Sequence, residues 1–119
     1  MNGGVGRESE FSRNLALDLR NIGAQVLVVH GHAFQAAGWP DLQVYHPTWT
    51  GHLELKVNQN KVDDLQRIVM NKLVAVGASV FVLRLVEWHV RVETPDGNLL
   101  STQRYPVKPM EFLRLLSSL

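Results

Sequence analysis

Three segments of the chain repeat their apolar residues at helical spacing, and they predict helices over residues 8–22, 62–76 and 110–119. Asn60 or Asp63 is the expected N-cap of the second helix, and Gly77 ends it. The glycine-rich residues 1–7 are expected to be flexible. The apolar stripes consist of Phe11, Leu15, Leu19 and Ile22 in the first helix and of Leu65, Ile68, Val69, Leu73 and Val76 in the second.

Extended segments lie between these helices. Residues 24–30 form a continuous β-branched run, which is typical of a strand covered on both faces, so we expect this strand to be central. Residues 78–85 have the same character. Residues 88–93 alternate apolar and polar positions, and a Thr-Pro-Asp-Gly turn predicts a return strand over residues 98–104.

Two further strands are predicted within residues 38–57, where charged side chains interrupt apolar runs. The Pro-, Thr- and Gly-containing segment Pro47–Gly51 predicts the turn of a β-hairpin. A turn centred between residues 47 and 48 places Asp41 opposite Glu54, whereas a one-residue slip would move Asp41 to the other face. The predicted order is αβββαβ, followed by a hairpin and a short helix.

The hairpin brings two acids and a lysine together. Because successive strand residues point to opposite faces, Glu54 and Lys56 share a face with Asp41, while residues 53, 55 and 57 point into a core. Two neighbouring carboxylates raise the pKa of at least one of them unless a cation compensates. A hard divalent cation such as Mg²⁺ prefers carboxylate oxygens and contacts phosphate oxygens. This pattern therefore predicts metal-dependent chemistry on a phosphate.

Composition narrows the alternatives. With 119 residues, of which 45% are hydrophobic, the chain fits one domain over residues 8–119, with a core at 8–85 and an extension at 86–119. No membrane span and no signal-peptide pattern is recognisable, so we expect a soluble, cytoplasmic protein without membrane partners. The absence of cysteine excludes disulfides, thiolate zinc sites and a cysteine nucleophile. A net charge of +1 does not by itself indicate nucleic-acid binding.

Four ordered motifs resemble the PD-(D/E)xK nuclease superfamily, and within it most closely the VRR-NUC type related to archaeal-style Holliday junction resolvases. The motifs are ESEF at residues 8–11, GWPDLQV at 38–44, HLELKV at 52–57 and LQRIVMNKLVAVGASVFVLR at 65–84. The resemblance implies an α/β, restriction-endonuclease-like fold, in which helices flank a mixed central sheet. It also implies a Mg²⁺-dependent endonuclease, with Mn²⁺ as a substitute, that cuts branched or junction DNA and forms a homodimer.

The resemblance also implies roles for individual residues. Asp41, Glu54 and the backbone carbonyl of Leu55 would bind the metal, and Lys56 would orient the attacking water and stabilise charge on the phosphate. The helix acid of the family matches Glu10, although Glu8 is only two residues away. Gln66 would reach the site from the second helix, although without the resemblance an ordinary solvent-facing helix position is the preferred explanation. Candidate phosphate contacts, each of which also fits a solvated surface, are Lys61, Arg67, Lys72 and Arg84.

Other interpretations remain open at this stage. The chain could be a non-catalytic DNA-binding or scaffold protein with a nuclease fold, or a nuclease for flaps, single strands or specific duplex sites. A zinc site formed by His30 with His32, or by His46 with His52, lacks a tight ligand cluster. His32 is a candidate auxiliary residue of the site. Trp39 is expected to pack or to stack on DNA, and Trp49 at the turn could touch DNA or a partner subunit.

Overall fold

The computed structural model describes residues 3–29 and 37–119, and it describes side chains from residue 7 onward. Its elements follow the predicted order, and the six strands form one sheet in the order β1-β2-β3-β4-β5-β6. The pair β3 and β4 is parallel and the other pairs are antiparallel, which confirms the mixed sheet. The elements are α1 (Gly3–Asn21), β1 (Gln25–Val28), β2 (Leu42–Tyr45), β3 (Thr50–Val57), α3 (Asp64–Ala75), β4 (Val80–Val86), β5 (His89–Glu93), β6 (Leu99–Arg104) and α4 (Pro109–Ser118).

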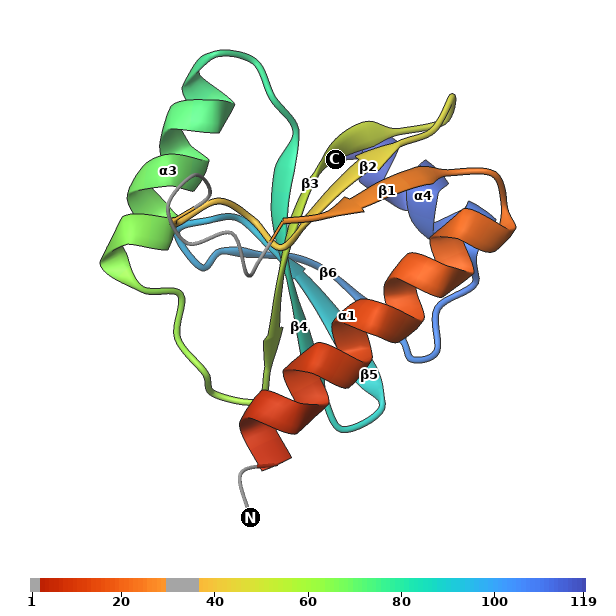
Figure 1. The fold of residues 1–119 in the computed structure, drawn as a ribbon, viewed down its shortest axis with the longest axis horizontal. Coiled ribbons are helices and arrows are strands. Elements are labelled where there is room, and N and C mark those ends of the chain that lie inside the picture. The colour runs from red at the N-terminus through yellow and green to blue at the C-terminus, as the bar shows by residue number, and fades with distance from the viewer. Residues whose placement is uncertain (1–2, 30–36) are drawn as a thin grey trace.

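Helices cover the two faces of the sheet unequally (Figure 1). The larger apolar cluster joins α1 and α4 to the inward residues of β3, where Leu53, Leu55 and Val57 are buried. On the opposite face a smaller cluster joins Met70 of α3 to Val80 and Val82 of β4. The second face therefore has room for polar side chains. No helix in the described part of the chain is long and apolar enough to cross a membrane.

The hairpin register agrees with the prediction. Leu42 pairs with Leu53 and Tyr45 pairs with Thr50, which are the partners expected from a turn centred between residues 47 and 48. The same register places Asp41, just before β2, beside Glu54. The predicted convergence of the two acids is therefore confirmed.

The position of β1 differs from the prediction. This strand lies at an edge of the sheet and pairs only with β2, so the prediction of a central strand is wrong. Leu27 remains 55% exposed, while Val26 and Val28 pack against the larger cluster. An edge strand covered by α1 on one face accounts for the alternating exposure that a β-branched run does not reveal.

The apolar face of α1 is buried as predicted, but the start of α1 and the apolar stripe of α3 need correction. Helix α1 begins at Gly3 rather than at Glu8, and therefore includes residues assigned to the flexible N-terminus. On α3, Leu65 and Ile68 are each 50% exposed and Val76 is 83% exposed, so this stripe is not a buried face. The sheet opposite α3 carries His52, Glu54 and Lys56, which offer few apolar partners to the helix.

Trp49, in the turn before β3, has a structural role. Trp49 is buried, its Nε1 donates a hydrogen bond to Ser79 Oγ at 3.0 Å, and its ring packs against Phe81. Gly51 leaves no room for a Cβ atom between this ring and the carbonyl of Ser79. The suggested surface role of Trp49 is therefore wrong. The segment after residue 85 completes the sheet as β5 and β6 and closes the larger cluster with α4.

Candidate active site

The loop before β2 positions Asp41 near the middle of the sheet. Gly38 has a φ of 80°, and a Cβ atom there would lie 2.8 Å from Leu65 Cγ and 2.9 Å from Val69 Cγ2. Glycine therefore allows α3 to close on this loop. The backbone of Asp41 is held from the other side, because Val29 N–H donates to its carbonyl at 2.8 Å.

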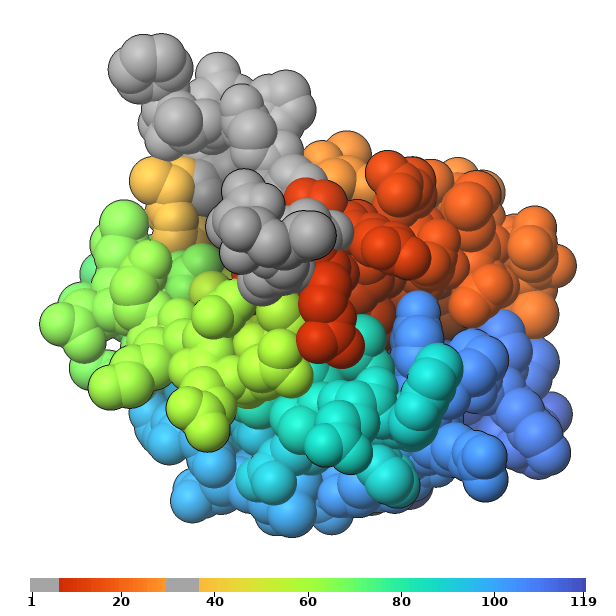
Figure 2. All heavy atoms as spheres, turned by 90° about the horizontal axis from the view of Figure 1, so that it is seen from below, coloured from red at the N-terminus to blue at the C-terminus, as the bar shows by residue number. Residues whose placement is uncertain are grey.

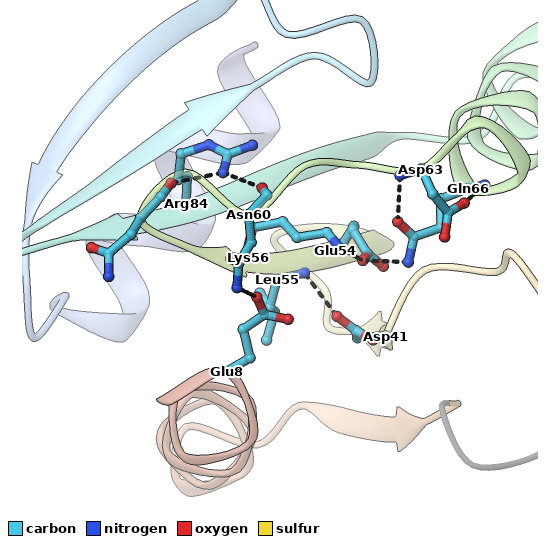
Figure 3. A network of polar contacts seen from close by, with 10 residues as sticks. Glu8, Asp41, Glu54, Leu55, Lys56, Asn60, Asp63, Gln66 and Arg84 are labelled. Carbon is cyan, nitrogen blue, oxygen red and sulfur yellow. Dashed lines mark hydrogen bonds and ion pairs between the residues drawn. The ribbon is translucent and has the colours of Figure 1, made fainter. Parts of the chain in front are cut away.

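The side chain of Asp41 is held by β3. Leu55 N–H donates a hydrogen bond to Asp41 Oδ2 at 2.9 Å (Figure 3). The N–H and C=O groups of one strand residue point to the same side of the strand. The carbonyl of Leu55 is therefore directed toward the side on which Asp41 lies.

Glu54 is the most unusual charged residue of the fold. It is 1% exposed, and within the described chain its Oε1 atom has no hydrogen-bond partner. The pKa of Glu54 is raised from 4.5 to about 8, mainly because burial disfavours the charged carboxylate and also because the carboxylate of Asp41 lies nearby, while the ammonium of Lys56 opposes the rise. An unpartnered buried carboxylate oxygen is costly, so Glu54 Oε1 is a candidate atom for holding a ligand.

Lys56 lies two residues along β3 on the same face. Its Nζ atom is 3.4 Å from Glu54 Oε2, and the residue is only 8% exposed. The ion pair uses one oxygen of Glu54, so the second oxygen remains available to a ligand. Glu54 and Lys56 therefore lie on the same face of the sheet, as predicted.

Gln66 connects the start of α3 to Glu54. Asp63 Oδ1 accepts from Gln66 N–H at 2.8 Å, and Gln66 Oε1 accepts from Asp63 N–H at 3.0 Å, which together form a capping box. Because the amide oxygen faces Asp63, the amide nitrogen is directed to Glu54 and donates to Oε2 at 3.0 Å (Figure 3). Gln66 is thus more than a solvent-facing helix residue, and Asp63 rather than Asn60 is the N-cap.

The two acids of α1 have different surroundings. Glu8 accepts a hydrogen bond from the side chain of Asn60, in the loop after β3, and points toward the site (Figure 3). Glu10 is exposed and lines a separate cavity together with Trp88 and Tyr105. Figure 2 shows α1 from residue 7 onward in red between the segment after β3 in yellow-green and the β4–β5 turn in cyan. The structure therefore brings Glu8, not Glu10, close to the β3 site.

The predicted phosphate contacts fall into two groups. Lys61 and Lys72 are exposed, and Arg67 is exposed but paired with Asp64 at 2.7 Å. Arg84 instead holds the loop after β3, because its Nη1 donates to the carbonyls of Asn58 at 2.8 Å and Asn60 at 2.6 Å. This support of the site, and the role of Asn60, carried no recognisable sequence signal.

The histidines within the described residues do not form a metal cluster. His46 stabilises the hairpin turn, since its Nδ1 accepts from Thr48 N–H at 3.0 Å. His52 is partly buried, which lowers its pKa, and its ring lies 6.0 Å from that of Trp39. His30 and His32 lie outside the described residues. Across residues 3–29 and 37–119, no group of three His, Cys, Asp or Glu residues could hold a metal ion.

The donor set nevertheless suits a hard cation. The unpartnered Glu54 Oε1, the Asp41 carboxylate and the Leu55 carbonyl are all oxygen donors, and Mg²⁺ commonly uses only one or two protein carboxylates together with water. The absence of a three-residue cluster among the described residues is compatible with this mode of binding.

Comparison with known proteins relates the fold to nucleases. No protein-family model and no curated protein sequence matches the chain. Among solved structures, the chain is similar to Hjc, a Holliday junction resolvase from the archaeal hyperthermophile Archaeoglobus fulgidus, with a TM-score of 0.57 and 16% identity over 86% of this chain and 92% of that chain. A second structure, the DrdV–DNA complex, matches with a TM-score of 0.46 and 13% identity over 94% of this chain but only 11% of that chain. The likeness to Hjc shows that the chain has a restriction-endonuclease-like nuclease fold.

Proposed function

We propose that this protein is a Mg²⁺-dependent endonuclease that hydrolyses phosphodiester bonds of DNA, with Mn²⁺ as a substitute. The observation that carries the proposal is the buried, unpartnered Glu54 Oε1, which lies on the same face as Asp41 and Lys56 in a nuclease fold. A fold alone does not assign an activity, so the proposed activity is assigned from these side chains.

Each residue of the site has a distinct task in this proposal. Asp41, Glu54 and the Leu55 carbonyl would hold the metal. When bound, the metal would act as a Lewis acid toward the phosphate and would lower the pKa of a bound water. Lys56 places a positive charge beside the scissile phosphate and stabilises the charge that develops there. Gln66 fixes the orientation of Glu54 through Oε2, so that Oε1 stays directed to the ligand.

Removal of the Lys56 charge tests the proposal. We expect Lys56→Ala to fold and to bind DNA, but to cleave it about 10²- to 10³-fold more slowly, because a preorganised charge at the phosphate is lost. The matched control is Lys108→Ala, which removes an exposed lysine at the N-cap of α4, where its side chain makes no capping hydrogen bond, and should leave the rate unchanged. Equal cleavage rates for Lys56→Ala and the wild type would exclude the proposed role of Lys56.

The substrate is tested with supercoiled plasmid, single strands, flaps and four-way junctions, each with Mg²⁺, Mn²⁺ or EDTA. We expect cleavage only with metal and a preference for the junction, which is the substrate named for the resolvase Hjc. Cleavage in EDTA would exclude the metal mechanism. DNA binding that is unaffected by Asp41→Ala, without any cleavage, would identify a non-catalytic DNA-binding protein instead.

Two further properties belong to this proposal. A homodimer would present two sites to the two symmetric strands of a junction. The cytoplasmic location also remains a prediction.

A further inference from the structure

A row of cations crosses the sheet on the face that carries Glu54. Lys56 of β3 pairs with Arg84 of β4, and Arg84 pairs with Arg91 of β5. Thr102 of β6 pairs with Arg91 and ends the row. Since cross-strand partners point to the same face and neighbouring strands lie about 4.8 Å apart, the row extends roughly 14 Å from Lys56 to Thr102.

Like charges that face each other directly across strands are destabilising. The adjacent row contains the compensating acids, Glu54 and Glu93. Glu93 is 5% exposed and accepts from Arg84 Nε at 3.3 Å and from Arg91 Nε at 3.1 Å. Two arginines thus share one carboxylate, and the row keeps an excess of positive charge.

The two arginines use their remaining nitrogens differently. Nη1 of Arg84 is bonded to the loop carbonyls of Asn58 and Asn60. The side chain of Arg91 is 42% exposed, and within the described chain only its Nε takes part in a hydrogen bond or ion pair. Its two terminal nitrogens are therefore available to a ligand.

Arg91 lies beside a hollow of about 690 Å³ on this face. The hollow is bounded by the loop of residues 58–60 and by Arg84, Arg91 and Glu93. Helices α1 and α4 pack on the other face of the sheet, and α3 packs near Val80 and Val82. Amide side chains and a guanidinium group suit hydrogen bonds to phosphate oxygens, because arginine presents its donors as a planar fork.

The hollow adjoins the candidate active site through Arg84 and Asn60. Arg84 pairs with Lys56 across β3 and β4, and Asn60, which borders the hollow, also bonds Glu8. We propose that the hollow is a second phosphate-binding subsite, in which Arg91 holds the DNA backbone next to the phosphodiester at Glu54 and Lys56. This inference rests on the proposed nuclease function and adds a binding surface to it.

The subsite is tested by the salt dependence of DNA binding in EDTA, where no cleavage is expected. Fluorescence anisotropy of labelled single-stranded and duplex DNA would be measured over a range of salt concentrations. We expect Arg91→Gln to weaken binding and to reduce the slope of log K against log salt by about 0.7 for the single strand or 0.9 for the duplex, as for one lost phosphate contact. The matched control is Arg114→Gln, which removes an exposed arginine from α4 and should leave the slope unchanged.

A second pair of variants leaves the Glu93 ion pairs intact. Thr102 is exposed on the edge strand β6, directly opposite Arg91. We expect Thr102→Asp to weaken DNA binding and Thr102→Lys to strengthen it. This pair decides the question even if Arg91→Gln fails to fold.

The outcomes separate the subsite from the nuclease. If the wild type cleaves DNA but Arg91→Gln and both Thr102 variants bind like Arg114→Gln, the subsite is excluded and the nuclease function stands. If the wild type binds DNA through Arg91 but never cleaves it with either metal, the nuclease function is excluded and the subsite stands. If the wild type does not bind DNA, both are excluded.

Discussion

At the scale of single residues, the site depends on which atoms of a side chain are occupied. Glu54 has one oxygen held by Lys56 and Gln66 and a second oxygen without a described partner. Asp41 is held through Oδ2 by the backbone of β3. The role of Glu54 therefore depends on which of its two oxygens the fold holds and which has no described partner, rather than on the number of acids nearby.

The two acids of α1 provide a matched pair of substitutions. We expect Glu8→Gln to reduce metal-dependent cleavage at least tenfold, because Glu8 points toward the β3 site and bonds Asn60, whereas Glu10→Gln should leave cleavage unchanged. Cleavage rates at several Mg²⁺ concentrations would measure the effect. The reverse order of the two variants would restore Glu10 as the helix acid.

The buried carboxyl of Glu54 predicts a pH dependence of stability in the absence of metal. Its pKa is about 8 in the folded protein and 4.5 as an ordinary value, so the folded state favours the protonated form. Protonation of Glu54 therefore contributes to the free energy of unfolding. This contribution is complete below pH 4.5 and is lost as the pH rises toward and through 8, so the free energy of unfolding falls by up to about 1.4 kcal/mol per pH unit.

Urea unfolding at a series of pH values would measure this slope, with Glu54→Gln as the control. We expect the variant to lack the decline between pH 4.5 and 8. We also expect Mg²⁺ to stabilise the wild type more at pH 8 than at pH 5, because metal binding requires the ionised carboxylate. A wild type and a variant with parallel pH profiles would contradict the assignment.

At the scale of elements, the packing of α3 on the loop before β2 positions Asp41. We expect Gly38→Ala to destabilise the fold by about 1–3 kcal/mol, because the added Cβ would meet Leu65 and Val69. The loop would shift and carry Asp41 with it, so cleavage should also fall.

Gly77→Ala separates crowding from backbone strain. Gly77 also has a positive φ, of 97°, but a Cβ atom there would meet nothing within 4 Å. Thermal unfolding and cleavage rates of both variants would be compared. If Gly77→Ala reduces cleavage as much as Gly38→Ala does, contact with α3 is not what positions Asp41.

Elements and register were predictable where local rules determine them. The turn chemistry of residues 47–51 and the alternation along β3 were sufficient to place Asp41 beside Glu54. The edge position of β1 and the exposure of Leu65 and Ile68 were not predictable, because both depend on which surface lies opposite. The contact between Glu8 and Asn60 joins segments far apart in sequence, which no local pattern specifies.

At the scale of the whole molecule, one sheet connects the candidate active site with the C-terminal hairpin. The core elements up to β4 hold Asp41, Glu54 and Lys56, while β5 and β6 extend the face beside them with Arg91 and Thr102. Residues 86–104 are thus an extension in sequence but a continuation of the same surface in space, while α4 packs on the other face.

The proposed homodimer is a prediction at this scale. We expect sedimentation equilibrium to give twice the mass of one chain at micromolar concentrations, because two sites would serve two symmetric strands. Addition of a four-way junction should then give a complex with two chains per junction. A single chain per junction, with both strands cut in separate binding events, would contradict the dimer.

The capping box at the start of α3 restricts how the sequence can vary. The carboxylate of Asp63 and the amide of Gln66 satisfy each other, and the same amide orients Glu54. A substitution at either position would therefore change the helix cap and the site together, so a change at one position requires a change at the other. Among descendants of this sequence that keep the activity, positions 63 and 66 are expected to be retained or exchanged as a pair.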